Sequence, residues 1–205
     1  MTETDKSRIL VAYATRHGST AEVAEAIAGE LRAALTGVDV VPIHDGLDPA
    51  GYDAVVVGGP MIMGWHREAM RFVKRHSDTL SRVPTALFIT AASLTETAED
   101  GVAGVPIFKD PRLVKEPRQP GKLSYKERYA APRHYLGAVL EKAPALRPFA
   151  VAFFGGSLDL TRMNLLEKLF VMLVVGAAPG DLRNWEAIRG WARELTPGLR
   201  GTARD

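Results

Sequence analysis

Three short segments of the chain combine hydroxyl, small and flexible residues in a way that suits the binding of a phosphorylated ligand. The first segment consists of Thr15, Arg16, His17, Gly18, Ser19 and Thr20. An apolar run precedes it and apolar residues at helical spacing follow it, so it lies where a helix begins. The first backbone N–H groups of a helix lack partners inside the helix and favour negative charge. We therefore predict that N–H and O–H groups of this segment bind a phosphate.

The other two segments also follow apolar runs that indicate buried strands. The second contains Gly58 and Gly59, followed by Pro60, Met61, Ile62, Met63, Gly64 and Trp65. The third consists of Thr90, Ala91, Ala92, Ser93 and Leu94. Ligands of open α/β sheets bind at the carboxyl ends of the strands, so we expect the three segments to meet there. They suit a flat, mostly apolar ligand that is held by its phosphate and stacked on Trp65, with Met61 and Met63 beside the ring.

Strands and helices alternate along most of the chain, which predicts a doubly wound parallel α/β sheet. Apolar runs predict strands at about 9–13, 38–43, 54–57, 85–90 and 149–154. Apolar residues at helical spacing predict helices at about 19–35, 66–80, 125–142 and 185–195, with Asn184 as the cap of the last one. We expect one domain over residues 1–205, because this length suits a single α/β domain.

An insertion at about residues 95–124 interrupts the alternation, and its prolines and glycines show no clear periodicity. A structureless loop of this length in a compact domain is usually functional or mobile. We expect its basic residues to close over the carboxylates of a substrate as a lid; these are Lys109, Arg112, Lys115 and Arg118. A solvated, partly disordered insertion without a role of its own remains the alternative.

Composition excludes several classes of function. The chain has no cysteine, which removes disulfides, iron–sulfur clusters and thiol chemistry. Its five histidines show no metal-ligand spacing, and no P-loop motif is present, so we predict no metal site and no nucleoside triphosphate site. A net charge of +2 is too small to indicate nucleic acid. The polar start and the lack of a long apolar run predict a cytoplasmic protein.

Residues 165–175 form a nearly apolar run that fits none of the predicted sheet helices. This pattern is typical of a core helix or of an interface helix in a homo-oligomer. The alternative is a peripheral contact with the inner face of a membrane, in which the helix lies in the interface, because the run is too short to cross a bilayer.

The motif Thr15-x-x-Gly18-x-Thr20 after the first strand resembles the FMN-phosphate loop of flavodoxins. The runs at 58–66, 154–158 and 180–186 make the chain similar to the menaquinone-dependent, flavodoxin-like protoporphyrinogen oxidases. The resemblance implies a flavodoxin-like, five-stranded parallel sheet in the order 2-1-3-4-5, with the insertion after the fourth strand. It also implies FMN as the cofactor, bound by the three segments.

Three functions are compatible with this resemblance. The first is an FMN-dependent oxidoreductase that acts on a flat small molecule, such as a porphyrinogen, and passes electrons to a quinone. The second is a flavodoxin-type electron carrier that serves another redox partner, and the third is a quinone reductase. Carrier flavodoxins are typically acidic, whereas this chain is mildly basic, and its third segment lacks the aromatic residue that carriers usually stack on the flavin. We therefore predict the enzyme, although no residue is identified as catalytic.

Overall fold

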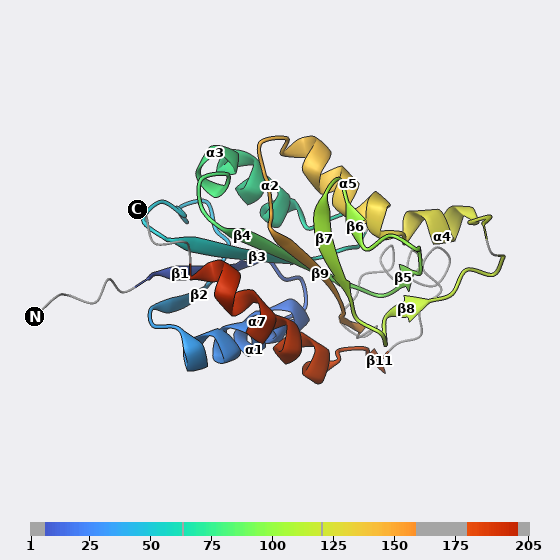
Figure 1. Cartoon of the computed structure of the whole chain (residues 1–205), viewed down its shortest axis with the longest axis horizontal. Helices are drawn as coiled ribbons and strands as arrows, with labels where there is room; N and C mark the ends of the chain where they lie inside the picture. Colours follow the sequence, from blue (N-terminus) through green and yellow to red (C-terminus); the bar gives the residue numbers. More distant parts are fainter. Residues whose placement is uncertain (1–6, 63, 120, 159–179, 201–205) are drawn as a thin grey trace, which may run out of the picture.

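One sheet runs through the molecule, with its strands in the order β2-β1-β3-β4-β9-β7-β6 in this computed structural model (Figure 1). The structure describes residues 7–62, 64–119, 121–158 and 180–200. All neighbouring strands of the sheet are parallel except the β6–β7 pair at its edge. The strands of the sheet are β1 (Ile9–Tyr13), β2 (Val38–Pro42), β3 (Ala54–Pro60), β4 (Thr85–Ala91), β6 (Gly101–Val102), β7 (Val105–Lys109) and β9 (Ala150–Gly155).

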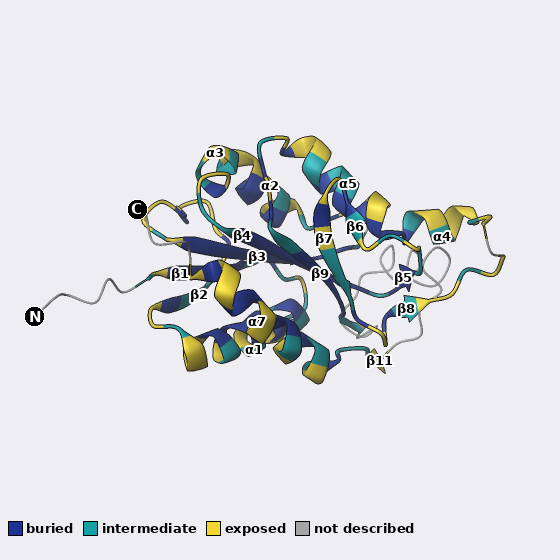
Figure 2. Ribbon diagram, in the orientation of Figure 1, coloured by how far each residue is buried: buried dark blue, intermediate teal, exposed yellow. Residues whose placement is uncertain are grey.

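Helices cover both faces of the sheet, which is why its central strands are apolar on both sides (Figures 1 and 2). All seven residues of β3 and all seven of β4 are buried. Helices α1 and α7 pack side by side on one face, and α2, α3, α4 and α5 lie on the other. The helices are α1 (Ser19–Ala34), α2 (Arg67–Arg75), α3 (Ser77–Leu80), α4 (Tyr125–Tyr129), α5 (Pro132–Lys142) and α7 (Trp185–Leu199).

The five predicted core strands and their order are confirmed, whereas two of the predicted helices are each divided. The helix expected at 66–80 breaks at His76, whose φ of −108° and ψ of 20° leave the helical region. The helix expected at 125–142 ends before Pro132, which begins α5 because proline is tolerated in the first turn of a helix and not in its interior. Asn184 does cap α7, since its side chain accepts a hydrogen bond from the backbone N–H of Ala187.

The prediction of a structureless insertion is wrong. Strand β7 pairs in parallel with β9 and extends the sheet, and β6 pairs with β7 in antiparallel. Two further strands of the insertion region, β5 (Leu94–Thr95) and β8 (Val114–Lys115), pair with each other. Phe108 of β7 packs against Phe154 of β9 with ring centroids 5.9 Å apart, so a non-local contact stabilises a segment that shows no pattern by itself.

The last two short strands lie beyond β9. They are β10 (Ser157–Leu158) and β11 (Gly180–Asp181), and they pair in antiparallel. Residues 165–175, for which the sequence leaves a core, oligomer or membrane role open, lie outside the described residues. In the described part of the chain, no helix is long and apolar enough to cross a membrane.

Candidate functional site

The loop between β1 and α1 has the geometry of an anion site. Gly18 is the residue before the helix and has a φ of +91°, which glycine adopts without strain. The backbone N–H of Gly18 donates to Thr15 Oγ1 at 3.0 Å, and this bond fixes the turn. Within the described loop no side chain caps the start of α1, and the backbone N–H groups of Ala21 and Glu22 donate to the carbonyl of Gly18. The N–H groups of Ser19 and Thr20, which precede them in the first turn, are therefore the ones that face a ligand. The helix dipole favours negative charge at this point.

A hydrogen bond between two threonines joins this loop to the third segment. Thr20 Oγ1 and Thr90 Oγ1 lie 3.0 Å apart, and the two residues are 1% and 3% exposed. Thr20 is in the first turn of α1, and Thr90 is near the carboxyl end of β4. One hydroxyl donates to the other, so the remaining proton of the pair is available to an acceptor outside it.

Residues of all three predicted segments line one hollow at the carboxyl edge of the sheet. Its lining residues are Arg16, His17, Ser19, Thr20, Pro60, Ile62, Thr90, Ala91, Ala92, Gly156 and Ser157. The enclosed part measures only about 30 Å³, so a ligand larger than a small anion extends from it onto the open surface. Gly156 and Ser157 were not predicted as site residues from the sequence, although the Gly-Gly-Ser run directly after the fifth predicted strand indicates a loop at the same edge of the sheet.

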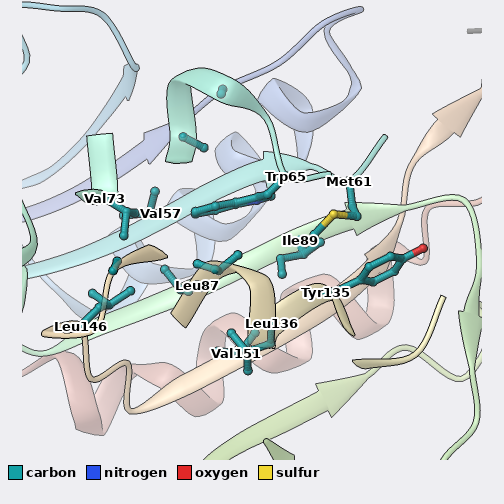
Figure 3. Packing of buried hydrophobic residues seen from close by; sticks show 14 of the residues in the cluster. Val57, Met61, Trp65, Val73, Leu87, Ile89, Tyr135, Leu136, Leu146 and Val151 are labelled. Atoms are coloured by element: carbon teal, nitrogen blue, oxygen red, sulfur yellow. The ribbon is translucent and has the colours of Figure 1, made fainter. Parts of the chain in front are cut away.

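Several predicted site residues do not face this hollow. Trp65 is 7% exposed, and its indole N–H donates to the carbonyl of Gly59 at 3.1 Å. Trp65 packs with Met61 in the cluster of buried apolar residues to which α2 and α5 also contribute (Figure 3). Both residues are therefore buried on the side of the sheet away from the hollow, and their expected contact with a ligand ring stays a prediction. Gly64 also faces away from the hollow, on the same side as Trp65, and Met63 lies outside the described residues.

The second half of the third segment also turns away from the hollow. The carbonyl of Ser93 accepts a hydrogen bond from the hydroxyl of Tyr135 at 3.4 Å, and Leu94 is fully buried in β5. The pairing of β5 with β8 draws this part of the chain toward the insertion. Only Thr90, Ala91 and Ala92 of the segment remain in the hollow.

The expected basic lid is not what the structure shows. Lys109 forms an ion pair with Glu96 and also donates to the carbonyl of Thr97 at 2.9 Å, so its ammonium is already engaged. The backbone N–H of Arg118 donates to Glu127, which belongs to the capping box of α4. These contacts join parts of the insertion to one another and to the adjoining α4, and none of its basic residues is among the described residues that line the hollow.

The described titratable residues near the hollow do not form a cluster of metal ligands. His66 caps α2 through Nδ1, which accepts from the N–H of Glu68, and burial lowers the pKa of His66. Only His17 among the described histidines lines the hollow. The described residues contain no group of three or more histidine, aspartate or glutamate side chains that could hold a metal ion. The site therefore offers hydrogen-bond donors and apolar contacts, which suits an organic anion.

The profile of a family described as "Flavodoxin domain" matches residues 10–182, which is most of the chain. The chain belongs to this flavodoxin-domain family. The protoporphyrinogen IX dehydrogenase [quinone] of Escherichia coli K12 is 25% identical to this flavodoxin-domain protein over 199 residues. That alignment covers 92% of this chain and 94% of the relative.

Two solved structures illustrate the likeness of the fold. A metal-soaked Flv1 flavodiiron core from Synechocystis sp. PCC6803 aligns with a TM-score of 0.52 and 9% identity, over 96% of this chain and 37% of that one. A Fusobacterium nucleatum flavodoxin bound to flavin mononucleotide aligns with a TM-score of 0.33 and 14% identity, over 41% of this chain and 52% of that one. The family match and the strand order of the sheet, together with the likeness to the Flv1 core, confirm the flavodoxin-like α/β fold expected from the sequence.

Proposed function

We propose that this flavodoxin-domain protein is an FMN-dependent oxidoreductase whose cofactor phosphate binds at the start of α1. The observation that carries the proposal is the hollow at the carboxyl edge of the sheet, where the open first turn of α1 meets the buried Thr20–Thr90 pair. A phosphate there accepts hydrogen bonds from backbone N–H groups and from a threonine hydroxyl. Membership of the flavodoxin-domain family supports FMN as the cofactor.

The residues around the hollow fit the remainder of such a cofactor. The hollow also has apolar lining residues that offer contact to a ring, namely Pro60, Ile62, Ala91 and Ala92. Among its described lining residues there is no Phe, Tyr or Trp to cover a ring. A ring that extends from the hollow would therefore keep a face accessible to a substrate. FMN bound here would supply the electron and hydride chemistry, and the residues of the hollow would hold and orient it.

We further propose that the substrate is a porphyrinogen-like molecule and that the electrons pass to a quinone. The support is the Escherichia coli relative, which aligns with nearly the whole of both chains and acts as a protoporphyrinogen IX dehydrogenase with a quinone. In each two-electron step the substrate loses two electrons and two protons, and the quinone becomes a quinol by taking up the same number. An electron carrier is the competing function, and it needs neither substrate turnover nor an accessible ring face.

The proposal is tested first by the colour and the cofactor of the purified chain. We expect yellow protein that releases FMN, and not FAD, on denaturation. An anaerobic assay with protoporphyrinogen IX and menadione should then produce porphyrin fluorescence in proportion to the enzyme added. Protein that cannot be reconstituted with FMN would overturn the cofactor assignment. FMN-loaded protein that exchanges electrons with a flavodoxin reductase but turns over no porphyrinogen would identify a carrier instead.

A further inference from the structure

A second concave site lies on the face of the sheet that α2 and α5 cover. We name it the α2–α5 groove, and its volume is about 440 Å³. This falls within the range of about 300–1,000 Å³ that is usual for sites of small organic ligands. The groove is separate from the hollow described above, because the two share no lining residue. Neighbouring residues of one segment divide between them: Pro60 and Ile62 line the hollow, whereas Met61 and Trp65 line the groove.

The floor of the groove is apolar and aromatic. Met61, Trp65, Tyr135 and Val139 line it, and all four are less than a tenth exposed. Figure 3 shows Trp65, Met61 and Tyr135 along one side of this core. Burial raises the pKa of Tyr135, and it does the same for Tyr129 at the end of the groove, so both hydroxyls are neutral near pH 7. A floor of this kind favours a flat apolar body.

The rim of the groove is basic. Arg67, Arg71 and Lys74 follow one another at helical spacing along α2, and Lys142 stands on α5 across the groove. Aspartate and glutamate are absent from the described residues that line it. Arg71 has an exposed ion pair with Asp45 at 3.7 Å, whereas the other three cations form no ion pair within the described part of the chain. The rim therefore has positive charge that the protein itself does not neutralise.

We propose that the α2–α5 groove binds a flat aromatic small molecule that carries a carboxylate at its edge. The aromatic body packs on Trp65 and Tyr135, and the carboxylate accepts hydrogen bonds from the arginine and lysine side chains of the rim. This occupant fits both properties of the groove, since an uncharged aromatic leaves the charges of the rim unpaired and a simple anion makes no use of its apolar side chains. The proposal is independent of the FMN assignment, because its residues lie outside the hollow.

A matched pair of fluorescent probes tests the proposal on the purified full chain. Pyrene-1-butyrate carries the carboxylate, and pyrene-1-butanol has the same aromatic body without charge. We expect saturable, one-to-one binding of the butyrate, about fivefold tighter than that of the alcohol at low salt, with the difference reduced by added salt. Equal affinity of the two probes, or binding without saturation, would overturn the proposal. Vesicles with anionic headgroups are a further probe. If the protein binds these vesicles but does not bind the butyrate, the basic rim is a membrane-binding surface and the groove site is refuted.

Variants locate the binding to the groove. The double charge reversal Lys74→Glu/Lys142→Glu should weaken butyrate binding about tenfold and leave the alcohol unchanged. The double variant Arg82→Glu/Lys122→Glu makes the same change in net charge at exposed positions outside the groove and should leave both probes unchanged. Ala138→Trp, which fills the groove, should abolish binding of both probes in protein whose circular dichroism and Tm match the wild type. If the control pair weakens butyrate binding as much as the groove pair, or if Ala138→Trp binds both probes normally, the site is not the groove.

Discussion

The buried pair Thr20 and Thr90 gives the sharpest test of the site. Each residue can be replaced by valine, which has nearly the same shape and lacks the hydroxyl. The single variant Thr20→Val leaves the Thr90 hydroxyl buried without its partner at 3.0 Å, and Thr90→Val does the same to Thr20. An unsatisfied buried polar group costs about 1–3 kcal/mol. The double variant removes both hydroxyls, so it avoids that penalty.

We therefore expect each single variant to lower the free energy of unfolding by about 1–2 kcal/mol and the double variant to be about as stable as either single one. The coupling energy of the double-mutant cycle should then be about 1 kcal/mol or more in favour of the pair. Urea unfolding, followed by circular dichroism without added FMN, measures all four proteins at constant m-value. Additive losses would show that the two hydroxyls do not interact, and the geometry described for them would be refuted.

FMN affinity, measured by quenching of flavin fluorescence, separates this structural role from the proposed phosphate contact. Loss of a hydrogen bond to a charged phosphate costs about 1.5–3 kcal/mol, so Thr20→Val should weaken FMN binding about tenfold or more. The matched control is Thr85→Val at the opposite end of β4, where a fully buried hydroxyl donates to the carbonyl of Leu80 at 2.8 Å. That variant should lose stability but keep its FMN affinity. Equal effects of the two variants on FMN binding would place the phosphate elsewhere.

Three further predictions concern stability. Gly58→Ala would put a Cβ 1.8 Å from the Phe88 ring and should lower the free energy of unfolding, measured in urea, by about 1–3 kcal/mol. The control Gly29→Ala, on the open side of α1, should raise it by about 0.5–1 kcal/mol. Equal effects of the two variants would contradict the packing around Gly58. Asn184→Ala removes both the cap of α7 and the bond to a buried carboxylate at 2.9 Å, and should lower the Tm by several degrees; an unchanged Tm would contradict both contacts. The folded protein holds the pKa of His66 below its usual 6.5, so the unfolded chain binds more protons and the free energy of unfolding should fall as the pH drops through 6.5. His66→Asn, which keeps a cap acceptor, should flatten this pH dependence. An unchanged slope of stability against pH would refute the prediction.

The sequence was sufficient to predict the core of the fold and the position of the loop at residues 15–20, because the signals for both are local. Apolar runs and helical spacing identify β1, β3, β4 and α1, and each element buries the side that its own pattern indicates. The hydroxyl and glycine residues of 15–20 lie between a strand and a helix, and chain connectivity alone brings them to the edge of the sheet. Figure 1 shows the same alternation of strands and helices that the pattern predicted.

Only the tertiary structure decided what the side chains of the second segment and of the insertion do. A chain reversal pairs Met61 with Trp65 and buries both on the side of the sheet away from the hollow, and no sequence pattern gives the direction in which the indole points. Strand β7 forms because it pairs with the edge of β9 and because Phe108 packs against Phe154. Both contacts come from residues some forty positions away in the sequence. The basic rim of the α2–α5 groove arises in the same way, since Lys142 is remote from α2 in the sequence and joins its cations only when both helices pack on one face of the sheet.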